Sequence, residues 1–284
     1  MMDEKIEAEL LKNNDNRKII LDKYVPKSIS NENYQYTVFT RLNAVSTKKN
    51  LIRFENVRFD HCIFDGCYIR DCNFDSCSFV GARFVNSNFH GSSFSGCKFD
   101  YAFFDKTHVD VDILQRESPR EENLKMRFAR TLRMNFQQLG DAQAVNKAIS
   151  LELRATETHL FKSWASNETY YREKYPGILK IGKFLQWVQF RTLDLIWGNG
   201  ESILKLIGTT FFLIAIIGLI DTFSYKDPYN LQNFIDSFKA SPAIFFGILQ
   251  RSEYPYIYSA SIVFSRLTLF AMFTAILIKR FSRR

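Results

Sequence analysis

Large apolar side chains recur at every fifth position from residue 54 to residue 109, and this period strongly restricts the fold. A period of five matches neither the roughly 3.6-residue turn of an α-helix nor the two-residue alternation of a β-strand. It fits a coil in which each five-residue unit forms one side of a square and points its large residue inward. Phenylalanine occupies ten of the twelve positions: Phe54, Phe59, Phe64, Phe74, Phe79, Phe84, Phe89, Phe94, Phe99 and Phe104.

The inward neighbour two positions earlier is small or apolar throughout this run, and it accounts for every cysteine in the chain. Free cysteine packs as a small buried hydrophobic residue. An odd number of cysteines without paired metal-ligand spacing argues against both disulfides and a metal site. We therefore expect core packing for all of them, and no metal or cofactor. These residues are Cys62, Cys67, Cys72, Cys77 and Cys97.

The run resembles the pentapeptide-repeat family over about sixty residues. The resemblance implies a right-handed, four-sided (quadrilateral) β-solenoid, here expected over residues 50–112, with the phenylalanines as its core. Twelve units make about three coils, or about 15 Å at a strand spacing of about 4.8 Å, so both ends need caps. We expect residues 1–49 to form the N-terminal cap segment.

Some members of that family mimic DNA with an acidic face and bind topoisomerase. The outward charges here are mixed in sign, and they include Arg53, Arg58 and Lys98 as well as Glu55 and Asp60. A mixed surface favours a solvated scaffold face over a DNA mimic. We expect no nucleic-acid partner.

Ser118-Pro119-Arg120-Glu121 has the residue order of a helix start, with serine as the N-cap and proline in the first turn. Helical spacing of apolar residues on both sides of Gly140 then predicts a helical hairpin over residues 113–176. Residues 177–201 place basic, aromatic and apolar side chains on adjoining helix faces. This pattern predicts an amphipathic helix at a membrane interface, followed by a glycine hinge.

Two apolar runs, Ile203–Phe223 and Ile257–Ile278, are each long enough to cross a membrane. Basic residues flank the outer ends of both runs, whereas the loop between them balances its charges. The positive-inside rule therefore predicts that both termini are cytoplasmic and that the basic flanks face anionic membrane lipid. Met1–Asp15 is charged and has no apolar segment, so we expect no secretory signal and a location in the cell (inner) membrane. The C-terminal flank holds Lys279, Arg280, Arg283 and Arg284.

The loop between the two runs contains Asn233–Gly247, which is apolar and aromatic but too short to cross. A re-entrant half-helix between two spans is the design of two-span pore-loop channels, whose filter backbone lines a water-filled cavity. The order of elements resembles the two-span ion-channel family. Nearly the whole chain, including its Trp197–Glu201 linker, resembles pentapeptide-repeat proteins that carry such a C-terminal pore. The resemblance implies a two-transmembrane pore-loop-like domain over residues 202–284.

The expected filter departs from the potassium-channel pattern. A potassium filter needs successive backbone carbonyls from a strand like Thr-Val-Gly-Tyr-Gly. This chain offers Gly247 and no further glycine before the second apolar run, so we expect a filter that is not of the potassium type. The candidate pore and filter residues are Phe245, Phe246, Gly247, Ile248, Leu249, Gln250 and Arg251.

Arg266 is a charged residue inside the second apolar run, and Asp221 lies near the end of the first. Ionisable groups within a membrane face either a partner or a water-filled cavity. One interpretation places Arg266 on the pore wall, where several subunits would form a cationic ring that discourages cations. The other pairs it with Asp221 or Asp236 as a structural tie, and we favour the tie.

We expect a multi-domain membrane protein that assembles as a homo-oligomer, with a tetramer as the expected state, and acts as an ion channel or a channel-like protein. Its solenoid would sense or dock a cytoplasmic protein partner. The alternative is a membrane-anchored scaffold or interaction protein without conductance. The departure of the filter segment from the potassium-channel pattern favours this alternative. No nucleophile–base pair, metal cluster or phosphate loop is evident. We therefore expect no enzymatic activity and assign no catalytic, cofactor-binding or metal residue.

Overall fold

The computed structural model describes residues 17–281, which fold as two compact units that divide between residues 159 and 160. The first part of the expected cap segment, residues 1–16, lies outside the described residues. So do Arg283 and Arg284 of the basic C-terminal flank.

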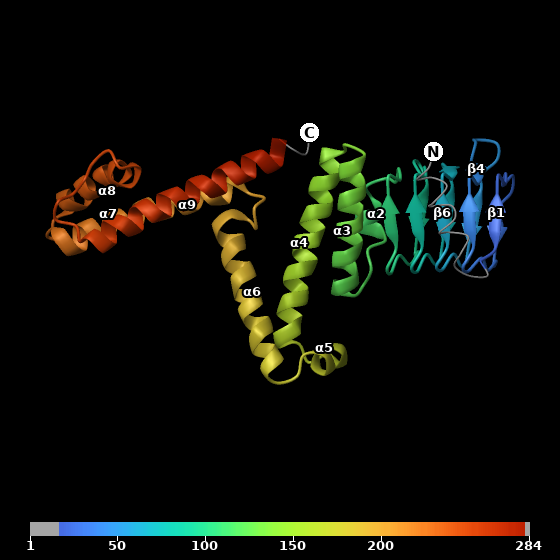
Figure 1. Ribbon diagram of the computed structural model, residues 1–284, viewed down its shortest axis with the longest axis horizontal. Coiled ribbons are helices and arrows are strands. Elements are labelled where there is room, and N and C mark those ends of the chain that lie inside the picture. The colour runs from blue at the N-terminus through green and yellow to red at the C-terminus, as the bar shows by residue number, and fades with distance from the viewer. Residues whose placement is uncertain (1–16, 282–284) are drawn as a thin grey trace, which may run out of the picture. The chain divides into compact units, whose positions relative to one another are not determined.

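The first unit begins with short parallel strands that stack in columns, one strand per coil (Figure 1). One column has the order β1-β3-β6-β9-β11, a second β10-β8-β5-β2 and a third β4-β7. Isolated bridges join the coils along the remaining side, as between Arg58 and Ser78. The strands are β1 (Ile19–Leu21), β2 (Ile29–Ser30), β3 (Val38–Thr40), β4 (Asn43–Val45), β5 (Arg53–Glu55), β6 (Ile63–Asp65), β7 (Tyr68–Arg70), β8 (Asn73–Asp75), β9 (Arg83–Val85), β10 (Ser93–Ser95) and β11 (Phe103–Asp105).

The phenylalanines form parallel ring stacks inside these coils. Phe54 lies 4.6 Å from Phe74 between ring centroids, and Phe74 lies 5.0 Å from Phe94, with interplanar angles of 7° and 13°. Each ring meets the equivalent ring of the next coil because strand partners carry the same residue type at this position. Near-parallel rings at such distances add to the stabilisation that burial of apolar area provides. All ten phenylalanines of the run are at most 8% exposed.

The solenoid starts before residue 50, which corrects the expected role of residues 1–49. Ile29 pairs with Phe54 and Phe39 with Phe64, so a further coil precedes the regular run. Across this step residues 25 apart in the chain face one another, as Ser28 and Arg53 do, instead of the 20 that separate later coils. Five extra residues are looped out of the wall between β4 and β5, where Thr47 and Asn50 close a tight turn through mutual backbone hydrogen bonds.

The longest column therefore holds five strands, more than the three coils expected from the regular run. The earlier coils were missed because the looped-out segment places Lys49 at the inward phase of the repeat. A charged residue there interrupts the pattern, although Ile29, Phe39 and Ala44 keep the same phase on the other side.

Helices close the C-terminal end of the solenoid. Helix α2 (Ile113–Arg116) is followed by α3 (Glu122–Gln138), and α4 (Ala142–Ala165) comes next in the chain. The Phe128 ring of α3 lies 5.8 Å from Phe99 and 6.2 Å from Phe104 between centroids, so it continues the aromatic core. Arg130 and Arg133 of α3 both donate to the Glu152 carboxylate of α4, at 2.9 and 2.8 Å.

The second unit is helical. It contains α5 (Thr169–Lys174), α6 (Ile178–Trp197), α7 (Ile203–Tyr225), α8 (Leu231–Phe246) and α9 (Tyr256–Phe281). Helices α7 and α9 run antiparallel. An ion pair between Glu201 and Lys279 joins one pair of ends, and the Tyr225 and Tyr254 rings meet at the other, 4.9 Å apart.

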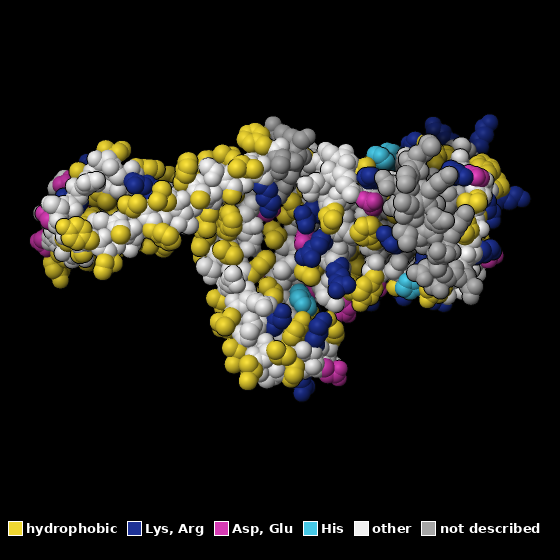
Figure 2. Space-filling view, in the orientation of Figure 1, with side chains coloured by type: hydrophobic (Ala, Val, Ile, Leu, Met, Phe, Trp, Pro, Cys, Tyr) yellow, Lys and Arg dark blue, Asp and Glu magenta, His cyan; other side chains and the backbone are white. Residues whose placement is uncertain are grey.

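Helices α7 and α9 are both long and apolar enough to cross a membrane. A core helix of a soluble protein would be mostly buried, but only 17% of the most apolar window of α7 and 11% of that of α9 are buried. Figure 2 shows hydrophobic side chains over much of the visible surface of α7, α8 and α9, with few charges among them.

Candidate functional site

The buried carboxylate of Asp221 is contacted by side chains from several segments of the second unit. The side chain of Asp221, near the C-terminal end of α7, is 1% exposed. It accepts hydrogen bonds from Tyr254 Oη at 2.6 Å and Ser237 Oγ at 2.8 Å. Two cations also approach it: Arg251 Nη2 at 3.4 Å and Lys226 Nζ at 3.5 Å. A buried charge is tolerated when it is paired and hydrogen-bonded, and Asp221 meets both conditions.

Helix α8 packs closely along α7. A side chain at Gly218 would meet the ring of Phe238 and the hydroxyl of Ser241, each within 3.4 Å. The absence of a side chain at Gly218 therefore lets the two helices approach at this level. Asn230 caps the start of α8 by accepting a hydrogen bond from the Gln232 N–H at 2.9 Å.

Helix α8 ends in a tight capping turn. Gly247 adopts a left-handed conformation with φ of 78°, and its N–H donates to the Ile244 carbonyl at 3.1 Å. The Ile248 N–H then donates to the Ala243 carbonyl at 2.8 Å. This pair of hydrogen bonds is the Schellman motif, which requires a residue that tolerates positive φ. The glycine at position 247 thus has a local structural cause, the positive φ of this capping turn.

The segment that follows returns to where α8 began. Ser237, in the second turn of α8, and Tyr254, at the end of the connection to α9, both hydrogen-bond the same Asp221 carboxylate. The chain from Leu231 to Pro255 therefore leaves the C-terminal end of α7, travels back along it as a helix, and comes back to the same end. Figure 1 shows α8 gathered beside one end of the α7–α9 pair.

Arg266 contacts the far end of α8. Its Nη1 lies 3.5 Å from the Phe245 carbonyl oxygen, and a Cβ at Gly247 would overlap its guanidinium group. A helix C-terminus carries partial negative charge, which favours a cation in this place. Among residues 17–281 Arg266 forms no ion pair with Asp221 or Asp236, and its polar contact is the Phe245 carbonyl. Asp221 instead meets Tyr254, Ser237, Arg251 and Lys226, and Asp236 accepts a hydrogen bond from Gln232 at 3.1 Å. The favoured tie between Arg266 and one of these carboxylates is therefore wrong.

The candidate filter residues separate into distinct environments. Phe245 is 3% exposed and packs in the core of this unit, whereas Phe246 is 58% exposed. Ile248 and Leu249 are exposed in the turn after α8, and Gln250 is exposed after them. Arg251 alone returns to Asp221. Because Gly247, Ile248 and Leu249 form a helix-capping turn, they do not present the extended carbonyl ladder of a potassium filter.

Of the residues that surround Asp221, the sequence singled out Arg251 alone, as a candidate filter residue and not as a partner of this carboxylate. Lys226, Ser237 and Tyr254 come from the end of α7, from α8 and from the segment before α9, so their convergence depends on the fold. One signal was available: a carboxylate at the end of an apolar run requires partners, and Lys226 lies five residues away, one and a half turns along.

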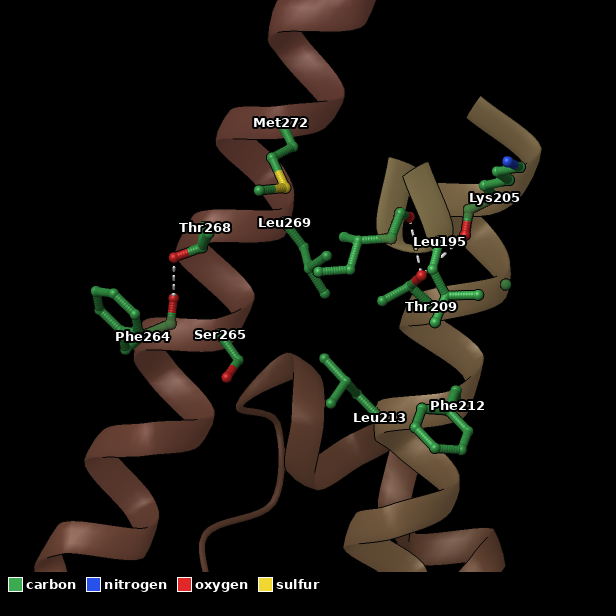
Figure 3. A pocket seen from close by; sticks show the side chains of 12 residues that line it. Leu195, Lys205, Thr209, Phe212, Leu213, Phe264, Ser265, Thr268, Leu269 and Met272 are labelled. Atoms are coloured by element: carbon green, nitrogen blue, oxygen red, sulfur yellow. Dashed lines mark hydrogen bonds between the residues drawn. The ribbon is translucent and has the colours of Figure 1, made fainter. Parts of the chain in front are cut away.

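A groove of about 660 Å³ lies between α6, α7 and α9, on the part of the helix pair that α8 leaves uncovered. Figure 3 shows Leu213 of α7 and Leu269 of α9 pointing toward each other across it. Thr209, also in its wall, donates its hydroxyl to the Ile196 carbonyl at 2.9 Å. The lining is otherwise largely apolar, so the groove suits hydrocarbon and not a polar ligand.

Comparisons with known proteins agree with the solenoid. The family described as "Pentapeptide repeats (8 copies)" matches residues 52–91 and again residues 72–108. Residues 52–108 therefore consist of pentapeptide repeats, which confirms this part of the sequence prediction. No curated protein matches the chain.

Two solved structures of trypsin-treated variants of QnrB1, a plasmid-mediated fluoroquinolone resistance protein, are similar in part. Their TM-scores are 0.21 and 0.20, with sequence identities of 16% and 12%. The matches cover 33% and 34% of this chain. The chain spans 54% and 62% of the length of these two relatives.

Proposed function

We propose that this protein is an oligomeric, ion-channel-like membrane protein whose helices α7 and α9 cross the cell (inner) membrane. The observation that carries the proposal is the path of residues 231–255, which enter and leave at one end of the α7–α9 pair. Two-span channels build their pores from such a segment, because irregular backbone within a membrane must be buried in protein or line a water-filled cavity.

The exposed apolar surface of this unit supports assembly from several copies. Phe211, Phe212, Phe264 and Phe270 are all between 65% and 72% exposed along α7 and α9. A single copy leaves the groove between these helices open to lipid. In the proposed homo-oligomer, with a tetramer as the expected state, neighbouring copies cover part of this surface and enclose the pore.

In this proposal both termini are cytoplasmic, and the solenoid senses or docks a protein partner there. Helix α6 carries exposed apolar residues along its length, including Ile178, Ile181 and Leu185, as a helix at the lipid interface would. The proposal therefore includes membrane lipid as a partner and does not include nucleic acid. The proposal includes no enzymatic activity and no potassium-type filter.

The second candidate is a membrane-anchored scaffold without conductance. The capping turn at Gly247 favours it, because this turn replaces the extended filter of a selective channel. The two candidates differ in assembly and in transport. A scaffold does not require several copies, so it is compatible with a monomer in detergent. A pore formed between copies of this hairpin requires an oligomer.

The test is reconstitution of the full-length protein in liposomes, combined with measurement of its mass in detergent. A channel is expected to be oligomeric and to release trapped ions. Asp221→Asn should reduce the flux, because it loosens the attachment of Arg251 and Tyr254. Asp236→Asn removes the same charge from an exposed position of α8 and should leave the flux unchanged. A monomer that passes no ion under any condition would establish the scaffold instead.

A further inference from the structure

The charged side chains of the second unit differ in whether they have a partner of opposite charge. Asp221 is paired with Arg251 and Lys226, and Glu201 is paired with Lys279. Arg266 has no carboxylate within ion-pair distance among residues 17–281, and its one polar contact there is the Phe245 carbonyl. Asp221, the most buried acidic side chain of this unit, therefore has two cationic partners. Arg266, in the middle of α9, has no acidic partner among residues 17–281.

Arg266 contacts the segment that forms the proposed pore. It lies on the same face of α9 as Ile262 and Leu269, which are both 8% exposed and belong to the core with Phe245. This face meets the C-terminal end of α8, just where the chain turns at Gly247. Since Arg266 is near the midpoint of α9, the guanidinium lies about halfway along the candidate span.

A helix that ends inside a membrane pore directs its negative end toward the permeation path and attracts mobile cations. Here a fixed guanidinium group already occupies that end of α8. A mobile cation that approached this end of α8 would be repelled by the positive charge of the guanidinium group. Repeated in every subunit, this charge would form a ring that repels cations and attracts anions.

We propose that the pore conducts small inorganic anions, and that Arg266 is the residue that excludes cations from it. This inference rests on the proposed channel function and adds the class of ion. It gives Arg266 the pore-wall role, which is the interpretation left once its pairing with Asp221 and Asp236 is removed.

The experiment uses the full-length protein in planar bilayers that separate unequal concentrations of potassium chloride. The wild-type current is expected to reverse near the chloride equilibrium potential. Arg266→Gln should lower the chloride-to-potassium permeability ratio by about tenfold or more. Arg266→Lys keeps a positive charge and should keep most of the preference. Lys239→Gln removes one positive charge from the exposed face of α8 and serves as the matched control, with the preference unchanged.

The outcomes separate the two proposals. Chloride preference in the wild type that Arg266→Gln abolishes and Lys239→Gln spares supports the inference. A wild-type current that reverses near the potassium potential overturns it while leaving the channel in place, and this measurement needs no variant to fold. Chloride preference that survives in a correctly assembled Arg266→Gln protein removes the role of Arg266. The absence of any current refutes the proposed function itself.

Discussion

Single polar side chains hold successive coils of the solenoid together. Asp60 is one of them, with its side chain 10% exposed. It accepts hydrogen bonds from Gln35 Nε2 at 3.2 Å in the preceding coil, and from Ser78 Oγ and the Val80 N–H in the following coil. Arg58 Nη2 lies 3.2 Å away. Burial alone would raise the pKa of Asp60, but these hydrogen bonds outweigh it and hold the pKa below its ordinary value.

The replacement Asp60→Asn should therefore destabilise the solenoid by about 1–3 kcal/mol at neutral pH, because an amide cannot accept all of these hydrogen bonds. A lowered carboxyl pKa contributes stability above the unfolded pKa and loses it as pH falls through the folded one. The difference from wild type should thus be constant near neutral pH and shrink below about pH 3.8. Asp75→Asn, at an exposed position, is the control and should change little.

The native cysteines provide the measurement for this prediction. All five are free and buried in the solenoid, so thiol labelling in urea reports its unfolding within the full-length protein. Burial raises the pKa of the Cys62 thiol to about 12 and that of Cys67 to about 11, which further suppresses reaction of the folded form. A pyridyl disulfide reagent extends the assay to acid pH. Equal urea midpoints for wild type and Asp60→Asn at pH 7 would contradict the assigned role of Asp60.

The sequence correctly predicted the burial of side chains whose environment depends only on their position in the repeat. Phe79 and Cys67 are buried because a five-residue phase alone determines which residues point inward. Polar partners could not be predicted in this way. Tyr254 meets Asp221 across 33 residues, and Arg266 meets a backbone carbonyl that has no signature in the sequence. The expected pairing of Arg266 considered only carboxylates, which is why it was wrong.

At the scale of elements, helix α3 closes the solenoid by replacing the next coil. Asn135 accepts a hydrogen bond from the Thr107 N–H and donates one to the Thr107 carbonyl, both at 2.7 Å. Thr131, one turn earlier, accepts from the Phe104 N–H at 3.0 Å. These side chains satisfy the backbone groups that a further strand would otherwise pair, so the last coil has no open edge here.

Asn135→Ala should destabilise the first unit by about 2–4 kcal/mol, since it leaves two backbone groups of Thr107 buried without partners. Gln137→Ala, on the exposed face of the same helix, should cost less than about 0.5 kcal/mol. The urea midpoint of thiol labelling compares the two variants. If they lose equal stability, helix propensity accounts for the loss and the capping role of Asn135 is refuted.

The elements also show where a repeat pattern stops being informative. The regular run predicted the coils that contain β5 to β11, because every unit there has the same length. The coils of β1 to β4 escaped prediction because five residues are looped out of the wall before β5. The helix of residues 178–197 was anticipated from its pattern, with the amphipathic face as the signal. The capping turn after α8 was not, because a single glycine fits a filter and a helix end equally well.

The whole molecule divides its chemistry between the two units. The solenoid contains every cysteine, and the described part of the second unit has none. The second unit instead exposes large apolar side chains along α7 and α9, where a soluble protein would bury them. The proposed topology can therefore be tested with single cysteines introduced elsewhere, because the buried native thiols give little background labelling.

Topology can be tested at two exposed positions of the full chain. Tyr229 is 96% exposed in the turn between α7 and α8, and Met134 is 48% exposed on α3. With both termini in the cytoplasm, Tyr229→Cys should react with a membrane-impermeant maleimide in intact cells. Met134→Cys should react only after the cells are permeabilised, because it precedes the first span. Labelling of both in intact cells would show that the membrane is not crossed as proposed, and the reverse pattern would invert the orientation. Either result would also move the solenoid out of the cytoplasm, and with it the partner that we propose it docks.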